Sequence, residues 1–249
     1  MIRYSLLAFA LASIPLSPPA AFAQSQPSPG STSVSPITAA RPQGDLDRDV
    51  NRKPLEVIAF AGVKPGMKVA ELAPGGGYYT RMLSAAVGPA GKVYVVATPR
   101  QAQRPGGLDT LNALAAVLPN VVVVTCEYTA LKLPEPVDVV WTTENYHDFH
   151  NGPTANIAAL DAAVFSALKP GGIFYVEDHA AADGAGLDAT SKVHRMDEAI
   201  AKAELASAGF KLDAESNLLR NPSDNKAGSN SEAGHFVTDR FMLRMKKPG

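Results

Sequence analysis

The chain has 249 residues, of which 46% are hydrophobic and 19% are charged, with 23 Lys and Arg against 24 Asp and Glu. This hydrophobic fraction is ordinary for a globular protein and excludes disorder, a collagen-like fibre or a coiled-coil fibre for the bulk of the chain. The balanced charge argues against broad nucleic-acid binding, which needs clustered basic residues, and the single cysteine, Cys126, excludes an intramolecular disulfide and a multi-cysteine zinc site.

The first 23 residues have the parts of a secretory signal. Arg3 precedes a short apolar stretch, and Ala21-Phe22-Ala23 supplies the small residues that a signal peptidase needs. Prolines interrupt the stretch, so an uncleaved membrane anchor is the weaker alternative. We therefore predict a signal peptide over residues 1–23, export to the periplasm, and no membrane attachment after cleavage. Residues 24–50 are predicted to be a flexible Pro/Ser-rich linker, and residues 51–249 a single domain.

Beyond Pro54, short apolar runs alternate with segments of helical periodicity. The pattern predicts helices and strands in the order helix 55–60, strand 67–72, helix 78–87, strand 92–97, helix 108–118, strand 121–124, strand 137–141, helix 154–168 and strand 171–177. The continuous β-branched run at 121–124 predicts a strand buried on both faces of a parallel sheet. Strand–helix alternation at this spacing indicates βαβ units and a doubly wound, Rossmann-like α/β sheet.

The last part of the chain departs from this alternation. A predicted helix over 196–208 is followed by predicted strands over 210–219 and 236–245, with only a polar loop between them. Two consecutive strands joined by a loop pair antiparallel. We therefore expect five parallel strands finished by a C-terminal antiparallel pair.

A glycine-rich turn follows the first predicted strand, in the segment Glu71-Leu-Ala73-Pro-Gly75-Gly-Gly77. Glycine can adopt positive φ and lets a ligand approach the backbone, and the N–H groups at the next helix start can bind an anion or carboxylate. Ligands of doubly wound sheets bind beyond the carboxyl ends of the strands, which is where this turn lies. A plain turn without a ligand is the alternative.

Residues 53–247 resemble the class I S-adenosylmethionine (SAM)-dependent methyltransferases. Residues 71–78 are similar to the first motif of that family, with Ala73 at its first glycine, and residues 168–172 (Leu-Lys-Pro-Gly-Gly) resemble the turn before its fifth strand. The closest resemblance is to a bacterial group of predicted methyltransferases that often carry signal peptides, through residues 145–149, 194–197, 219–222 and 238–241. The resemblance implies the class I methyltransferase fold, SAM as cofactor, and methyl transfer to a small molecule or envelope component.

The same resemblance implies the positions that bind SAM. In chain order these are Glu71, Ala73, Gly75 and Gly77 for the methionine moiety, Thr98 for the ribose, Glu127 for the adenine and Asn145 for the pocket floor. Thr98 stands where the family usually has an acid, and losing one charge-assisted hydrogen bond weakens binding by about 1.5–3 kcal/mol. A solvated loop carboxylate is the alternative role for Glu127.

The candidate catalytic residues follow the fourth predicted strand. His147, with its carboxylate neighbour Asp148, is the first candidate for a general base and His150 the second; a base is needed only when the acceptor carries a proton. In the alternative interpretation, these polar side chains only form hydrogen bonds within a loop and at the start of a helix. We expect no metal, because no tight His pair at helical spacing is present. A site assembled from His147, His150 and His179 with Asp148 or Asp178 is the less favoured alternative.

Arg195 has two interpretations: a site for an anionic substrate or, more favoured, helix capping or an ion pair with Asp197 or Glu198. The leading functional hypothesis is a SAM-dependent methyltransferase with a small-molecule substrate. The alternatives are a non-catalytic exported ligand-binding protein that retains the fold, and a nicotinamide oxidoreductase. The terminal antiparallel pair and the glycine spacing disfavour the oxidoreductase.

Overall fold

The computed structural model describes Met1, residues 41–231 and residues 237–249. Residues 2–23 of the predicted signal and residues 24–40 of the predicted linker lie outside the described residues.

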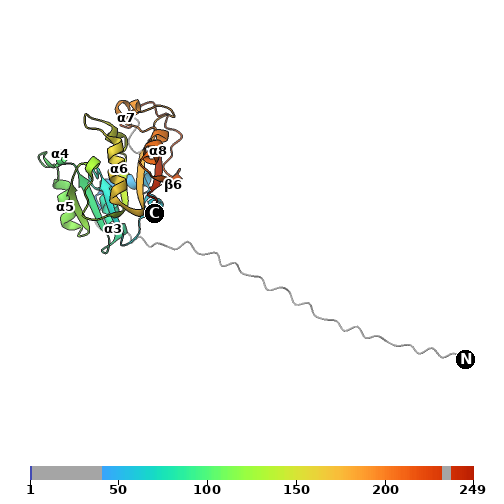
Figure 1. The fold of residues 1–249 in the computed structure, drawn as a ribbon, viewed down its shortest axis with the longest axis horizontal. Helices are drawn as coiled ribbons and strands as arrows, with labels where there is room; N and C mark the ends of the chain where they lie inside the picture. The colour runs from blue at the N-terminus through green and yellow to red at the C-terminus, as the bar shows by residue number, and fades with distance from the viewer. Residues whose placement is uncertain (2–40, 232–236) are drawn as a thin grey trace. The chain divides into compact units, whose positions relative to one another are not determined.

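A mixed seven-stranded sheet forms the centre of the domain (Figure 1), in the order β3-β2-β1-β4-β5-β7-β6. The strands are β1 (Lys68–Leu72), β2 (Lys92–Ala97), β3 (Val121–Thr125), β4 (Val137–Thr143), β5 (Leu168–His179), β6 (Lys211–Ser216) and β7 (Arg240–Lys246). The first five run parallel, and β7 pairs antiparallel with both β5 and β6. The predicted fold, five parallel strands with a C-terminal antiparallel pair, is confirmed.

Helices cover both faces of the sheet. On one face lie α2 (Pro54–Ala61), α3 (Tyr78–Val87) and α5 (Asp109–Val117), and on the other α6 (Ile157–Ala167) and α8 (Glu198–Ser207), which lie side by side in Figure 1. Successive strand residues point to opposite faces, so Val69 of β1 enters the first core and Ala70 the second. Short elements occupy the connections: α4 (Pro99–Ala102), α7 (Asp188–Lys192) and the 3₁₀ turns η1 (Tyr128–Ala130) and η2 (His147–His150).

The strand β3 differs from its prediction. It lies at the edge of the sheet, with residues 122–124 only partly buried and Thr125 exposed. Val123 packs toward one core, and Val122 and Val124 pack toward the other. The β-branched run therefore reflects packing against helices on both faces of the sheet. The prediction that this strand is fully buried is wrong, because β3 has a strand neighbour on one side only.

The helix α1 (Gln43–Arg52) begins within the segment predicted to be linker, so that boundary is corrected to a point before residue 43. Polar contacts hold it to α3. The Tyr78 hydroxyl donates a 2.6 Å hydrogen bond to Asp49, and Arg81 Nε donates one of 2.6 Å to Asp45. A composition argument that counts apolar residues misses a helix that is docked by charges.

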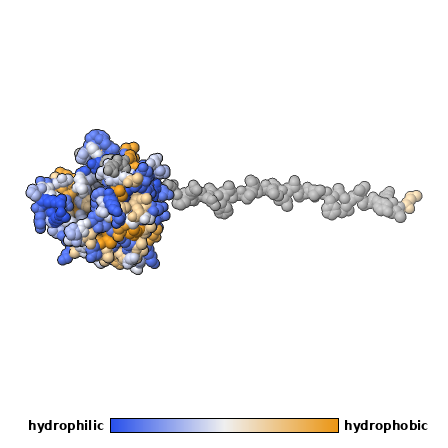
Figure 2. Space-filling model, turned by 90° about the horizontal axis from the view of Figure 1, so that it is seen from above, coloured by the Kyte–Doolittle hydropathy of each residue, from blue (hydrophilic) through white to orange (hydrophobic). Residues whose placement is uncertain are grey.

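The surface is mixed in character. On the face shown in Figure 2, hydrophobic residues lie among hydrophilic ones. Exposed large hydrophobic side chains belong to separate elements, for example Val50 in α1, Val117 in α5 and Leu212 in β6. In the described part of the chain, no helix combines the length and the apolar character needed to cross a bilayer.

Candidate functional site

The turn between β1 and α3 has a left-handed backbone at three positions: Ala73 (φ 49°), Gly75 (φ 54°) and Gly77 (φ 78°). A Cβ added at Gly77 would lie 2.2 Å from Leu114 Cδ1, so glycine is needed there for packing between α3 and α5. At Gly75, no heavy atom of the described chain would lie within 4 Å of an added Cβ. The open side of the turn is therefore at Gly75.

A cavity of about 370 Å³ lies above Gly75, and we call it the loop cavity. Its walls come from the glycine turn, from α1, from the start of α3, from the chain that follows β4, and from His194. It lies at the carboxyl ends of β1 and β4, where the order of the sheet reverses, which is the usual ligand position in a doubly wound sheet. Its volume falls within the ~300–1,000 Å³ range of small-molecule sites.

Two further cavities, of about 640 and 600 Å³, extend along the ends of β2 and β3. The first of them shares Ala73, Asn145 and Asp148 with the loop cavity. Both are lined by Thr98 and Tyr128. The three adjoining cavities form what we call the strand-end groove.

The structure brings most of the predicted SAM-binding residues to this groove. Glu71, Ala73, Gly75 and Asn145 line the loop cavity, while Thr98 and Glu127 line the continuation. Gly77 lines none of the three cavities and is instead the N-cap residue of α3.

Thr98 follows the end of β2 and caps α4. Its Oγ1 accepts a 3.2 Å hydrogen bond from the Gln101 backbone N–H. The side chain that stands at the ribose position therefore also serves the helix that follows it.

Glu71 is buried at the floor of the loop cavity, where it accepts a 2.6 Å hydrogen bond from the Thr80 hydroxyl. Burial raises the pKa of this carboxyl to about 8, although Thr80 and the nearby Arg81 and Arg52 act in the opposite direction. Glu71 is therefore largely protonated at neutral pH. A cation that enters the cavity would favour its ionised form.

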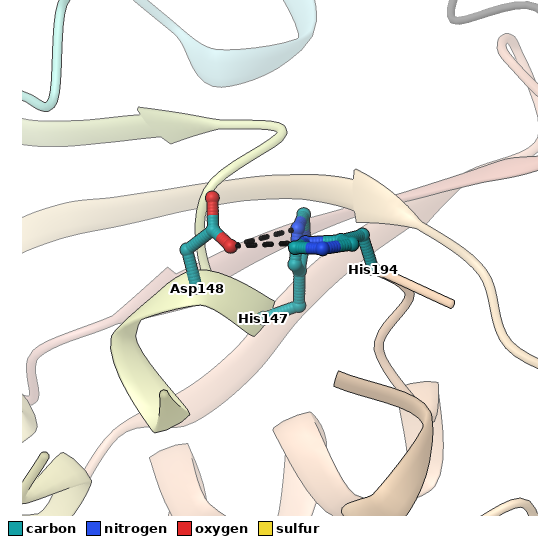
Figure 3. A group of neighbouring side chains, drawn as sticks. All are labelled: His147, Asp148 and His194. Carbon is teal, nitrogen blue, oxygen red and sulfur yellow. Dashed lines mark hydrogen bonds and ion pairs between the residues drawn. The ribbon is translucent and has the colours of Figure 1, made fainter. Parts of the chain in front are cut away.

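Three side chains, two of them from η2, meet at the wall of the loop cavity (Figure 3). His147 Nε2 lies 3.3 Å and His194 Nδ1 lies 3.4 Å from the same oxygen, Asp148 Oδ1. The other ring nitrogen of His147, Nδ1, lies 2.8 Å from Asp178 Oδ1, and the His147 backbone N–H donates to Asp178 Oδ2 at 2.6 Å. The imidazole of His147 is thus held between two carboxylates.

The two carboxylates decide the charge of His147. Burial lowers the pKa of this imidazole, but Asp178 and Asp148 outweigh burial and raise the pKa to about 10. At neutral pH His147 is therefore protonated and donates hydrogen bonds. This state does not suit a general base, which must be unprotonated to accept a proton, so it favours a positioning role for His147 in the site.

His150 and His179 contact residues outside the groove. His150 Nε2 lies 3.0 Å from Glu204 of α8, and its Nδ1 lies 3.0 Å from the Tyr146 carbonyl oxygen. His179 Nδ1 lies 2.7 Å from Thr238 Oγ1. Neither lines any of the three cavities, so His150 connects η2 to α8, and the four-residue metal alternative considered from the sequence does not assemble.

Arg195 is fully buried and pairs with Asp224 at 2.8 Å. The predicted ion pair with Asp197 or Glu198 is wrong: Asp197 instead caps α8, accepting from the Ala199 N–H at 3.0 Å. The partner of Arg195 comes from the long loop before β7, which no local sequence pattern indicates. Arg195 lines none of the groove cavities.

Several residues of the loop cavity were not predicted from the sequence. Arg48 and Arg52 come from α1, Tyr79 from α3, and His194 from a loop. The buried Tyr79 hydroxyl has no hydrogen-bond partner among the described residues, which is uncommon for a buried polar group outside a ligand site. The only local signal for Tyr79 is its place just after the glycine turn.

Backbone strain concentrates at the same cavity. Ala73, Glu144 (φ 56°) and His194 (φ 51°) are non-glycine residues with positive φ, and all three line it. Such conformations persist where the surroundings enforce them, and they cluster at functional sites.

A buried charge network braces this end of the sheet. Glu144 pairs with Arg52 of α1 and, at 3.0 Å, with Arg240 of β7. Arg240 also pairs with Glu177 of β5 at 2.9 Å. The network connects α1 to the ends of three strands and so fixes the α1 wall of the loop cavity.

No protein-family model matches the chain, and no curated protein matches it. Solved structures do resemble it. A SAM-dependent methyltransferase from Aquifex aeolicus is 18% identical, with a TM-score of 0.57 over 83% of this chain and 98% of that one. Fibrillarin from Aeropyrum pernix, with natively bound SAM, is 16% identical, with a TM-score of 0.51 over 80% and 76%. The cyclase SpnF is 14% identical, with a TM-score of 0.56 over 80% of each chain. These likenesses show that the chain has the class I methyltransferase fold.

Proposed function

We propose that this protein binds SAM in the strand-end groove and transfers the methyl group to a small-molecule acceptor held near His147, Asp148 and His194. The observation that carries the proposal is the loop cavity, open above Gly75 and floored by Glu71 at the ligand-binding edge of the fold. The shared fold with the A. aeolicus SAM-dependent methyltransferase supports it.

The charges in the groove suit the parts of SAM. Glu71 lies where an ammonium or sulfonium would favour its ionised form, and the guanidinium of Arg48 lines the same cavity, where it suits a carboxylate. The adenine fits the far end of the groove, beside the Tyr128 and Phe149 rings, whose centroids are 5.1 Å apart, and near Glu127. This orientation points the methyl group to the η2 side of the loop cavity.

Methyl transfer from a sulfonium is an in-line displacement. The acceptor atom forms the new bond to the methyl carbon as the carbon–sulfur bond breaks, leaving a neutral thioether. Holding both reactants in line supplies most of the acceleration. In this proposal, the glycine turn fixes the donor and the side chains that follow β4 fix the acceptor.

Calorimetric titration of the purified full chain with SAM tests the proposal. We expect one site, weakened at least tenfold in Gly75→Ala, because the new Cβ projects into the cavity. Gly66→Ala is the matched control: Gly66 also has positive φ (82°) and open space at its Cβ, but it lies before β1, outside the groove. An absence of heat at millimolar SAM, or equal losses in the two variants, contradicts the proposal.

The second candidate is a non-catalytic binding protein that retains the fold. Thr98 in place of a carboxylate supports it, and the cyclase SpnF illustrates that this fold occurs in a protein named for another activity. The export predicted from residues 1–23 also supports it, because SAM is made in the cytoplasm. If the ligand of such a protein is not SAM, this candidate predicts that SAM binds no more tightly than adenosine, whereas a methyltransferase site prefers SAM through the contacts of its methionine moiety.

A further inference from the structure

We propose that His147, Asp148 and His194 bind one divalent transition-metal ion at the η2 wall of the loop cavity. Each residue offers one ligand atom, and these atoms all lie within 4.8 Å of one another. Metal binding goes beyond the proposed methyl transfer and does not depend on it. Only the role of the ion toward an acceptor rests on the proposed function.

The spacing of the ligand atoms fits an ion. The contacts of His147 Nε2 and His194 Nδ1 with Asp148 Oδ1 are 3.3 and 3.4 Å, longer than the roughly 2.7–2.9 Å of a charge-assisted hydrogen bond. Two ligands that are each about 2.0–2.1 Å from a tetrahedral zinc ion lie roughly 3.3–3.4 Å apart. Figure 3 shows both rings approaching the same carboxylate oxygen, so two of the three distances between ligand atoms already match those around an ion.

The support behind His147 is of the kind found at metal sites. Asp178, which is fully buried, accepts from the His147 backbone N–H and from the His179 backbone N–H, and its Oδ1 lies 2.8 Å from His147 Nδ1. A metal-ligating histidine commonly donates its second ring N–H to a carboxylate, which fixes the tautomer and the ring orientation. Here Asp178 directs Nε2 of His147 to the other two ligands, and a bound ion would take the place of the proton on Nε2.

His194 supplies the third ligand from a strained position. Its φ of 51° is left-handed, and its ring centroid lies 5.7 Å from that of His147. The residue is 46 positions away from Asp148 in the chain, so the fold alone brings them together. This distance explains why His spacing in the sequence predicts no metal.

Two imidazoles and one carboxylate suit zinc or iron(II), and three protein ligands leave positions open to the cavity. If the proposed methyl transfer holds, an acceptor hydroxyl or thiol bound at an open position would lose its proton to solvent more readily and attack as the anion. The inferred acceptor class is therefore an oxygen or sulfur nucleophile.

Metal titration of the full chain, first treated with a chelator, tests the site. We expect one Zn²⁺ per chain, a rise in Tm on adding Zn²⁺, and visible absorption bands of a low-coordinate site on adding Co²⁺. His194→Gln and Asp148→Asn should each weaken Zn²⁺ binding at least tenfold. Both residues are exposed, so the fold should tolerate the changes.

Asp188→Asn is the matched control. It removes another exposed carboxylate near the site in the chain, one paired with Lys192 in α7, and should leave Zn²⁺ affinity unchanged. Zn²⁺ binding that is equal in all three variants, or no binding at micromolar Zn²⁺, overturns the inference. SAM titration of His194→Gln separates the two proposals, since SAM binding should persist where Zn²⁺ binding is lost.

Discussion

At the scale of single residues, Thr98 combines two roles: it caps α4 and lines the part of the groove proposed for the ribose. Aspartate also caps helices well, so Thr98→Asp should keep α4 while adding a carboxylate. We expect SAM affinity to rise about tenfold to a hundredfold, because a charge-assisted hydrogen bond contributes roughly 1.5–3 kcal/mol. Calorimetric titration with SAM measures the change.

Thr98→Asn provides the control for this change, because asparagine caps the helix but carries no charge. It should alter SAM affinity by less than the aspartate variant does. If Thr98→Asp and Thr98→Asn bind SAM equally, the ribose does not lie at the end of β2.

Glu71 makes stability depend on pH. Its pKa is about 8 in the folded chain against 4.5 for an ordinary glutamate, because it is buried. Between these values the folded state holds a proton that the unfolded state has lost, so the contribution of Glu71 to the free energy of unfolding falls as pH rises from about 4.5 to 8. Glu71→Gln should remove this fall. The free energy of unfolding of the variant should therefore exceed that of the wild type most clearly at pH 8.

Urea unfolding at pH 5 and pH 8 measures this effect. We expect the stability difference between Glu71→Gln and the wild type to be larger at pH 8 by about one to a few kcal/mol. The same difference at both pH values would show that Glu71 is ionised in the folded chain.

At the scale of elements, α1 shows how charges can dock a helix. Arg52 and Glu144 form a buried pair, and Arg240 and Glu177 extend it. Removing one partner of a buried pair costs about 3–5 kcal/mol when the other charge is left unpaired. Glu144 keeps Arg240 in Arg52→Ala, so this change should lower the free energy of unfolding by a smaller amount, about 1.5–3 kcal/mol, and loosen the contact of α1 with the loop cavity.

Denaturant unfolding, with limited proteolysis between residues 41 and 53, checks this prediction. Lys192→Ala is the control, because its pair with Asp188 is exposed and should contribute less than about 1 kcal/mol. Equal effects of Arg52→Ala and Lys192→Ala would mean that the buried network does not hold α1.

Much of the fold could be predicted from sequence because strand and helix periodicities are local. Residues 78–87 form a helix with the predicted bounds, and the terminal strands pair antiparallel, as predicted for two consecutive strands joined by a loop. The position of β3 at the sheet edge could not be predicted, since a β-branched run reports packing on its faces and says nothing of its strand neighbours.

The residues of the candidate site likewise fall into those that the sequence predicts and those that it does not. Gly75 and Glu71 were found because the glycine turn is a contiguous motif. His194, Arg52 and the Asp224 partner of Arg195 were not, because they come from distant parts of the chain and only the three-dimensional fold makes them neighbours.

At the scale of the whole molecule, one end of the sheet collects the unusual features. The carboxyl ends of the parallel strands meet there, and so do the open turn at Gly75, the buried and protonated Glu71, the unpartnered Tyr79 hydroxyl and the strained His194. Elsewhere in the described chain, the two cores pack the faces of the sheet with apolar side chains. Several of these features are energetically unfavourable in the folded chain. Their concentration at one end of the sheet indicates that this end is the functional one.

The most direct measurement is a crystal structure of the full chain grown with S-adenosylhomocysteine, the methyl-transfer product of SAM. We expect the amino-acid end of this molecule against Gly75 and Glu71, and its adenine beside Tyr128 and Glu127. A groove that stays empty at saturating ligand, or a ligand bound elsewhere on the molecule, would contradict SAM binding at this edge of the sheet.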